Sequence, residues 1–268
     1  MTAEQEYARV IRTKLHEAPL SPEDNAKKVA ELAAKVRGAY ESCSNLSLRA
    51  EIIEPPSPVI KHVQMATAPC LLKTRAYIDG ELVLVFTLRD GLFEEWKAAW
   101  NGVPEMHQIR AAESPNGPAR IELADGLERH TCGFGSYYRS WLGPGAEKVN
   151  HFVNRITSGM YIGVEMLDGR ECDVVACPPN QFYGGLDVLF VRPDGFVASW
   201  RTIVEFDDKP ARLIRIRNYS EYRTATLRPE TWNFEAPLEN LVPPASHRAD
   251  PAHPAVIFAL GSTEPRTP

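Results

Sequence analysis

Hydrophobic and polar residues alternate along much of the second half of the chain. Between residues 163 and 234, short β-branched and aromatic runs are separated by Asp168-Gly169 and by Pro193-Asp194-Gly195. Asp-Gly supplies the positive φ angles that tight hairpin turns require. The pattern therefore predicts an antiparallel sheet, around which the rest of the chain is organised.

A period of two also marks the segment between residues 46 and 88. In its first run every second residue is apolar, which predicts a strand with one buried face. These apolar positions are Leu46, Leu48, Ala50 and Ile52. Three more strands are predicted at residues 59–65, 71–78 and 81–88. The turn between the last two is predicted at Asp79-Gly80.

Residues 92–100 allow two interpretations. Their place after Asp90-Gly91 favours another strand of the hairpin series. The spacing of Phe93, Trp96 and Trp100 favours a helix. Both interpretations stay open on the sequence alone.

A period of three to four marks the N-terminal part of the chain. Residues 4–17 form a short helical candidate, and Ser21 and Pro22 suit the N-cap and first position of a longer helix. The apolar stripe of the longer helix must pack on another element, and a sheet is the natural partner. A partner helix or a membrane surface is the alternative. The stripe consists of Ala26, Val29, Ala33, Val36, Tyr40 and Cys43.

The middle of the chain, residues 101–158, is rich in Gly and Pro. A strand is predicted at residues 119–123 and helices at 137–142 and 147–156. Helices inserted between two hairpin series are well placed to cover one face of the sheet.

The domain organisation follows from these segments. We expect a helical extension at residues 1–25 and a single domain at 26–244. Residues 245–268 are rich in Pro, Ala and His with few apolar anchors, which predicts a weakly ordered tail.

Charge and hydropathy exclude some classes of protein. The formal net charge of −5 argues against a nucleic-acid-binding protein, which usually carries a basic excess. No apolar run approaches the roughly 20 residues that span a bilayer. The N-terminus as written lacks the basic and apolar regions of a signal peptide. This leaves a cytoplasmic protein, or an envelope protein without its signal.

Candidate chemistry is sparse. The five cysteines are interpreted as small buried hydrophobes, and Cys172 and Cys177 are expected on opposite faces of one strand, unable to bridge. The seven histidines form no metal-binding motif, and there is no Gly-x-Ser-x-Gly sequence. We therefore predict no catalytic residue, no metal and no cofactor.

Several passages, taken in order, are similar to those of a known family. They are residues 40–46, 69–75, 90–96, 168–175, 193–201 and 232–237. The series resembles the LolA/LppX-like superfamily of lipoprotein-localisation and lipid-carrier proteins over about residues 26–244.

The resemblance implies a mainly β (α+β) fold. It would be a strongly curved, half-open antiparallel β-barrel in which an N-terminal helix and mid-chain helices cover the concave face. Members of the superfamily bind acyl chains of lipids or lipoproteins in an apolar cavity and carry them through the periplasm, without a cofactor. The resemblance thus implies a monomeric, non-enzymatic protein of the cell envelope with a hydrophobic ligand and a membrane-protein partner.

Strand alternation predicts which side chains would line such a cavity. The candidates are Leu84, Phe86, Phe93, Trp96, Trp200, Val204 and Phe206. Each of them is equally suited to an ordinary core, because apolar pockets and apolar cores use the same residues.

Basic residues on the strands provide candidates for a polar anchor. Arg75 and Arg201 are the predicted anchors for a lipid head group. Arg201 belongs to a series with Arg212, Arg215, Arg217 and Arg223, for which an exterior sheet face is the alternative.

A second function class stays open. In a sensor or protein-interaction module, as in related domains of envelope-stress regulators, the same fold would have a filled interior and an exposed apolar patch. An enzyme would require a polar pocket with convergent titratable groups.

Overall fold

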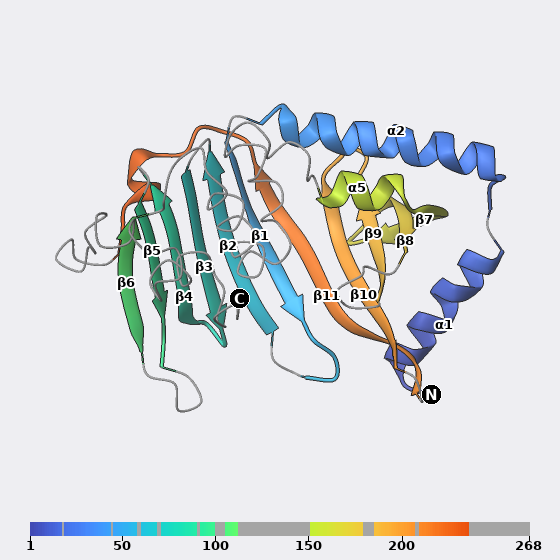
Figure 1. The fold of residues 1–268 in the computed structure, drawn as a ribbon, viewed down its shortest axis with the longest axis horizontal. Helices are drawn as coiled ribbons and strands as arrows, with labels where there is room; N and C mark the ends of the chain where they lie inside the picture. Colours follow the sequence, from blue (N-terminus) through green and yellow to red (C-terminus); the bar gives the residue numbers. More distant parts are fainter. Residues whose placement is uncertain are drawn as a thin grey trace, which may run out of the picture. The chain divides into compact units, whose positions relative to one another are not determined.

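The computed structural model shows a sheet of eleven strands with helices packed on it (Figure 1). It describes residues 1–17, 19–43, 45–57, 60–68, 71–89, 92–99, 105–111, 151–178, 185–206 and 209–235. The strand order is β6-β5-β4-β3-β2-β1-β11-β10-β9-β8-β7, which leaves β6 and β7 as the two edges. The predicted mainly β fold, with an antiparallel sheet that does not close, is confirmed.

The described residues group into two compact units, and each is considered by itself. The first unit draws on Met1–Cys43, Glu51–Ile60 and His151–Ser220, and the second on Ser44–Ala50, Lys61–Asn150 and Glu221–Pro268. The domain limits proposed from the sequence stay predictions, and residues 245–268 lie outside the described part of the chain.

The first unit contains the C-terminal hairpin series and the helices. Its helices are α1 (Ala3–His16), α2 (Pro22–Glu41) and α5 (His151–Thr157). Its strands are β7 (Met160–Leu167), β8 (Arg170–Cys177), β9 (Leu186–Val191) and β10 (Val197–Phe206), joined by most of β11 (Lys209–Arg223).

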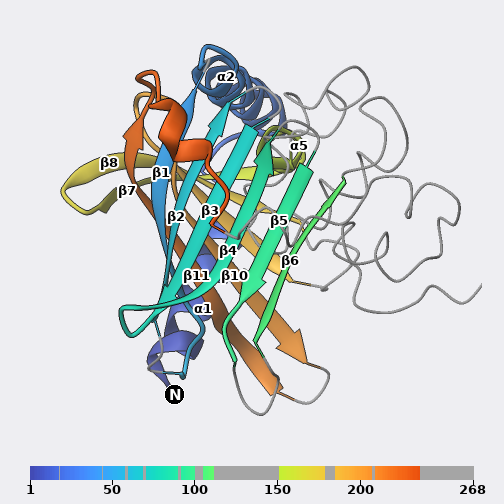
Figure 2. The same ribbon diagram turned by 90° about the vertical axis from the view of Figure 1, so that its left-hand side faces the viewer.

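The second unit is a meander of antiparallel strands, which Figure 2 shows side by side. The strands are β2 (Ile60–Ala68), β3 (Leu71–Ile78), β4 (Glu81–Arg89), β5 (Leu92–Lys97) and β6 (Met106–Ala111). A 3-10 helix, η2 (Pro229–Trp232), belongs to the same unit, and β1 (Leu46–Ile53) contributes to both units.

The Asp-Gly turns lie where the sequence predicts them. Asp79 and Gly80 have φ angles of 52° and 82°, and Asp168 and Gly169 have 50° and 75°. Two successive positive φ angles define the turn whose twist matches that of paired strands. The hairpins β3–β4 and β7–β8 are therefore set by their own local sequence.

Helix α2 begins as its sequence predicts. The Ser21 hydroxyl accepts a hydrogen bond from the Asp24 backbone N–H at 3.1 Å, and Pro22 is the first helical residue. The predicted stripe is buried from Val29 onward, but Ala26 is exposed. Leu32, which the predicted stripe omits, is buried.

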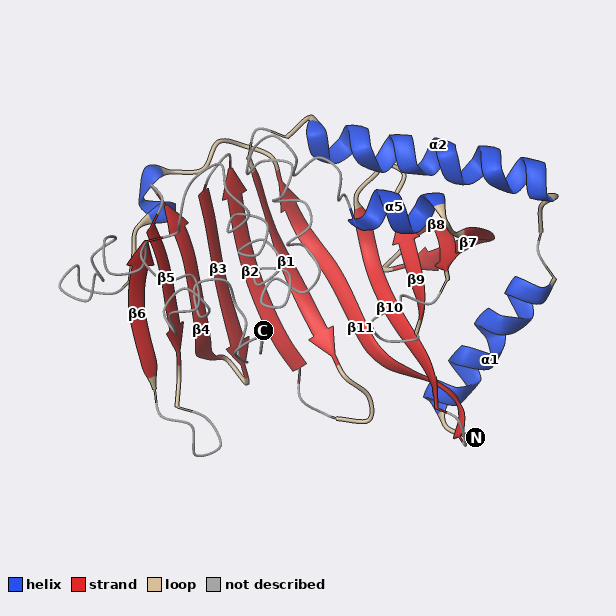
Figure 3. Ribbon diagram, viewed as in Figure 1, coloured by secondary structure: helices blue, strands red, loops and turns tan. Residues whose placement is uncertain are grey.

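In the first unit, helices lie on both faces of the strands (Figures 1 and 3). Ala8 and Ile11 of α1 share a core cluster with Val174, Phe190 and Ile203. On the other face, α2 and α5 pack against each other, α2 contacts β7, and α5 contacts β8. Among the described residues, no helix is both long and apolar enough to cross a lipid bilayer.

The middle of the chain gives mixed outcomes. Residues 92–97 form a strand, so the hairpin interpretation is confirmed and the helical one is wrong. The helix predicted at residues 147–156 appears as α5, with Phe152, Val153 and Ile156 buried. Strand β6 is not predicted from the sequence. The predicted strand at 119–123 and helix at 137–142 lie outside the described residues.

Three of the five cysteines lie in the described residues. Cys43, Cys172 and Cys177 are free and buried, which confirms the interpretation as small core residues for these three. Burial raises the pKa of the Cys177 thiol far above its usual value.

Candidate functional site

Strands β2, β3 and β4 share an apolar face in the second unit. In the ladder Val63 lies opposite Ala76, and Ala76 lies opposite Leu84. Phe86 follows on the same face, because side chains two residues apart along a strand point the same way. All four side chains are buried, as is Leu72. The structure thus brings the predicted residues Leu84 and Phe86 together on one surface.

Two polar groups interrupt this apolar face. Thr74 lies opposite Phe86 in the ladder, is 0% exposed, and its hydroxyl has no hydrogen-bond partner among the described residues. Glu95 lies opposite Phe86 on the other side, is buried, and pairs with the Lys97 ammonium at 2.5 Å. A buried hydroxyl without a partner costs about 1–3 kcal/mol, so a ligand that bonds to Thr74 would relieve that cost.

Trp96, another predicted residue of this unit, is placed differently. Trp96 lies opposite Val85, which puts it on the reverse face from Phe86. Its indole N–H donates to the Glu105 carboxylate at 2.5 Å. The backbone of Phe93 lies opposite Leu88 in the ladder, and its side chain is outside the described part of the chain.

Trp200 and Val204 of β10 lie against other parts of the protein. The ring of Trp200 meets the ring of Phe152 edge-on at 5.6 Å, and the Arg217 guanidinium lies 4.2 Å from the Trp200 ring centroid. Val204 is buried, and a Cβ placed on Gly185 would lie 3.2 Å from its Cγ2 atom. Phe206 is at the end of β10, and its side chain is not described.

Arg201 lies on the face of β10 opposite to Trp200. Its guanidinium carbon lies 4.5 Å from the Phe190 ring centroid and 5.0 Å from that of Tyr7. Burial raises the pKa of Tyr7 to about 12, although the charge of Arg201 opposes the shift. The structure places this predicted anchor among aromatic rings beneath α1.

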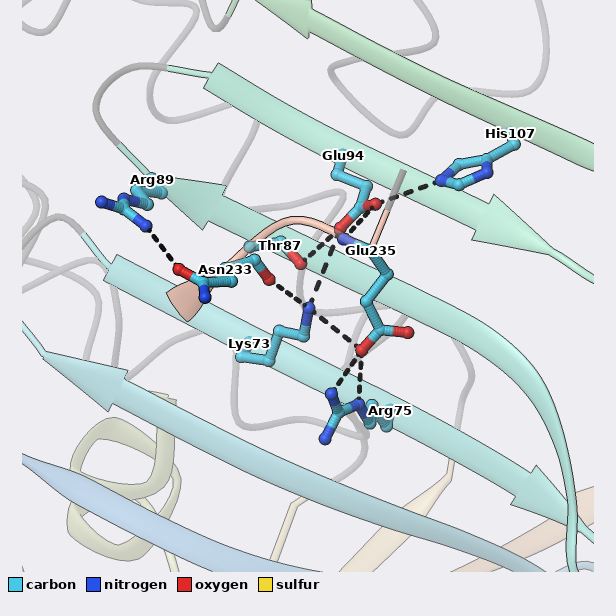
Figure 4. Close-up of polar contacts among 8 residues, drawn as sticks. All are labelled: Lys73, Arg75, Thr87, Arg89, Glu94, His107, Asn233 and Glu235. Atoms are coloured by element: carbon cyan, nitrogen blue, oxygen red, sulfur yellow. Dashed lines mark hydrogen bonds and ion pairs between the residues drawn. The ribbon is translucent and has the colours of Figure 1, made fainter. Parts of the chain in front are cut away.

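Arg75, the other predicted anchor, belongs to a cluster of charged residues on the reverse face of β3–β5 (Figure 4). The centre of the cluster is Lys73, which is 4% exposed, beside Glu94, which is 0% exposed. The Lys73 ammonium lies 3.8 Å from Glu94 and 3.2 Å from Glu235, and it donates to the Asn233 carbonyl at 2.8 Å. Arg75 donates to Glu235 through its Nε atom at 2.7 Å.

The carboxylate of Glu94 has a partner on each oxygen. The Thr87 hydroxyl donates to Oε2 at 2.8 Å, and the Glu235 backbone N–H donates to Oε1 at 2.8 Å. His107 Nε2 lies 3.1 Å from Oε1. A buried carboxylate is tolerated when its lone pairs are satisfied in this way.

The pKa values in this cluster follow from burial and charge. Burial lowers the pKa of Lys73, and the carboxylates of Glu235 and Glu94 offset part of that shift. Burial alone would raise the pKa of Glu235, but the hydrogen bond from Arg75 and the charge of Lys73 outweigh it and lower the pKa. Arg75 and Lys73 thus favour the ionised form of Glu235.

The polar cluster attaches a distant segment of the chain to the sheet. Lys73 and Arg89 donate to the backbone and the side chain of Asn233, and Glu94 accepts from the backbone of Glu235. Trp232 packs on Ala66 beside them. We call residues 229–235, with η2 at their start, the C-terminal strap. The attachment of this strap accounts for the buried charges of Lys73 and Glu94 as structural contacts.

Sequence reasoning missed most of this cluster. Lys73 and residues 232–237 are part of the passages that resemble a family, but nothing links them locally to Glu94 or His107. Among the described residues, no three His, Cys, Asp or Glu side chains could hold a metal ion.

Comparison with known proteins gives likenesses of fold. No protein-family model matches the sequence, and no curated protein matches it. Among solved structures the chain is similar to MucB, with a TM-score of 0.46 and 13% identity over 78% of this chain and 64% of the MucB chain. It is also similar to the lipoprotein LppX of Mycobacterium tuberculosis, with a TM-score of 0.41 and 9% identity over 75% of this chain and 98% of LppX.

A third structure, LprF from Mycobacterium bovis, matches with a TM-score of 0.41 and 12% identity over 77% of this chain and 98% of LprF. At these identities and TM-scores the likeness concerns the fold alone, so the function rests on the chain's own residues.

Proposed function

We propose that this protein binds a hydrophobic ligand, an acyl chain of a lipid or lipoprotein, on the apolar face of β3 and β4. The observation that carries the proposal is the surface formed by Leu72, Ala76, Leu84 and Phe86, with the unpartnered Thr74 hydroxyl among them. The cell envelope is the location that the family resemblance in the sequence implies.

The two faces of these strands differ in what they offer a ligand. The C-terminal strap lies over the face of Lys73 and Glu94, where buried charges are already satisfied. The opposite face presents aliphatic and aromatic side chains, and burying an acyl chain there gains roughly 0.8 kcal/mol for each methylene. Thr74 supplies a hydroxyl that a carbonyl or carboxyl group of the ligand would meet. Such a protein needs apolar area and no catalytic group.

The test is photoaffinity labelling with a palmitic acid analogue that carries a diazirine. The purified protein is labelled with and without excess palmitic acid, and the labelled peptide is identified by mass spectrometry. We expect saturable labelling within Leu71–Arg89, which palmitic acid suppresses. Absence of saturable labelling, or labelling confined to other segments, would refute the proposal and favour the protein-interaction module.

Two matched variants locate the site further. Phe86→Leu and Trp200→Leu remove a buried aromatic ring from the two surfaces at which the sequence predicts ligand contacts. Loss of about 1–2 kcal/mol of contact predicts a five- to thirtyfold drop in saturable labelling for Phe86→Leu. Trp200→Leu should label like the wild type, because Phe152 already fills that surface. Circular dichroism confirms that both variants fold.

A further inference from the structure

Strand β7 is an edge of the sheet, with β8 as its one neighbour. At the start of this edge the Asn25 side chain takes the place of a strand: it accepts from the Tyr161 backbone N–H at 2.8 Å and donates to the Gly159 carbonyl at 3.3 Å. Beyond Gly163, the described residues offer the outer backbone groups of β7 no further partner. An open edge of this kind is a template for another extended segment.

The open part of β7 also exposes apolar side chains. Val164 is 53% and Met166 is 63% exposed. Both lie on the face that carries α2, because Val164 is opposite Asp173, whose carboxylate pairs with Lys28 of α2 at 3.0 Å. Glu165 points to the other face, where Lys14 neutralises it at 2.5 Å. The edge is therefore apolar on one face and carries no unpaired charge on the other.

We propose that β7 pairs antiparallel with β7 of a second copy of this chain, so that the two sheets continue into each other about a two-fold axis. The occupant of an open edge must be extended and must carry apolar residues at every second position. The second copy meets both requirements with Val164 and Met166. A two-fold axis perpendicular to the sheet keeps equivalent faces on the same side, so these side chains meet their counterparts as cross-strand pairs.

Charges at the two ends of β7 favour the antiparallel arrangement. The hairpin end carries Asp168 and Glu171, which outnumber Arg170 there. The other end lies beside Lys28, whose ammonium is 4.8 Å from the Tyr161 ring centroid; Lys28 and Lys35 share the one carboxylate of Asp173, which leaves a positive excess there. Antiparallel pairing brings the acidic end of one copy to the basic end of the other, twice by symmetry. Parallel pairing would bring like ends together.

The geometry also limits the strength of the pairing. The register between β7 and β8 shifts between Tyr161 and Gly163, and such a bulge bends the strand. Pairing is thus restricted to residues 164–167. Pairing over so few residues buries less area than the interface of a permanent dimer does. We therefore expect a weak dimer whose population depends on the protein concentration.

Sedimentation velocity tests the proposal on the full chain, from about 1 μM to about 300 μM, which spans the Kd range of small interfaces. The wild type should shift from monomer to dimer within this range. Val164→Lys puts a charge at the centre of the pairing and should raise the dimer Kd tenfold or more. The control Val10→Lys changes a valine on α1 that is 36% exposed, outside the pairing edge, and should leave the dimer Kd unchanged.

Hydrogen exchange measured at the lowest and highest protein concentrations locates the dimer interface in the chain. The wild type at high concentration should gain protection in the peptide that contains residues 160–167, and Val164→Lys should not. A chain that stays monomeric throughout, or a dimer that Val164→Lys leaves intact, would overturn the inference.

Discussion

Gly195 lies so close to Lys35 that no larger residue fits between the β9–β10 turn and α2. A Cβ atom on Gly195 would lie 2.7 Å from the Lys35 carbonyl oxygen and 2.9 Å from the Ala39 Cβ atom. Gly195 also has a φ of +88°, which side chains disfavour. Beside it, the Tyr40 ring meets the Phe196 ring at 4.9 Å, and the Tyr40 hydroxyl accepts from the Val197 backbone N–H at 3.2 Å.

The first prediction concerns this close approach. Gly195→Ala should lower the free energy of unfolding by about 2–4 kcal/mol, because conformational strain of roughly 1 kcal/mol adds to the displacement of α2. The measurement is urea unfolding followed by circular dichroism. Gly169→Ala is the matched control: its φ is +75°, but a Cβ there would meet nothing within 4 Å.

The two glycine variants separate backbone strain from packing. Gly169→Ala should cost only the strain, about 1 kcal/mol. If both substitutions lower the free energy of unfolding equally, α2 does not contact the β9–β10 turn as closely as the structure shows.

The second prediction concerns the buried ion pair that holds α5 on the sheet. Arg155 of α5 contacts the Asp187 carboxylate at 2.5 Å, and the Thr202 hydroxyl donates to the other oxygen at 3.0 Å. Asp187→Ala leaves the Arg155 charge without its partner and should cost about 3–5 kcal/mol in the free energy of unfolding. Thermal and urea unfolding provide the measurement.

The double variant Arg155→Met with Asp187→Leu is the control for this pair. It removes both charges and should recover a large part of the stability that Asp187→Ala loses, since apolar replacements of similar size are well tolerated. A loss below about 0.5 kcal/mol for Asp187→Ala would show that the pair does not hold α5.

The sequence predicts those parts of the fold whose causes are local. The two Asp-Gly turns and the start of α2 depend on residues within a few positions of one another, and the structure places them as expected. Strand β6 lacks this kind of signal: Met106–Ala111 has no regular alternation of apolar and polar residues.

The candidate site depends on relations that a single sequence does not contain. Whether Trp96 shares a face with Phe86 is decided by the register of β4 and β5, which pairs Trp96 with Val85. Lys73 and Glu235 form an ion pair although they are far apart in the sequence. The residues next to either one give no indication of its partner. The sequence leaves Arg201 either as a polar anchor or on an exterior sheet face, and only the position of α1 shows that the Tyr7 ring lies 5.0 Å from its guanidinium carbon.

The third prediction concerns the attachment of the C-terminal strap. Lys73→Met keeps the length of the side chain but removes the cation between Glu94 and Glu235, so it should cost about 3–5 kcal/mol in the free energy of unfolding. Hydrogen exchange should show faster exchange of the peptide that contains residues 229–235, because the Asn233 carbonyl loses its donor. Arg89→Met removes an exposed hydrogen bond to the same segment and should cost under about 1 kcal/mol. Equal effects of the two variants would contradict a strap held by its buried charges.

The last prediction is a dependence on alkaline pH that resides in one side chain. Tyr7 has a pKa of about 12 in the folded protein because it is buried, against 10.0 when exposed. Between these values the unfolded chain releases the phenol proton while the folded chain keeps it. The contribution of Tyr7 to stability is therefore complete below pH 10 and is lost as the pH rises toward 12.

From pH 9 to pH 11 the free energy of unfolding of the wild type should fall by about 1 kcal/mol more than that of Tyr7→Phe. At pH 7 the two should differ little, because the Tyr7 hydroxyl has no hydrogen-bond partner among the described residues. Urea unfolding of both proteins at pH 7, 9 and 11 provides the comparison, and parallel pH profiles would show that α1 does not bury this phenol.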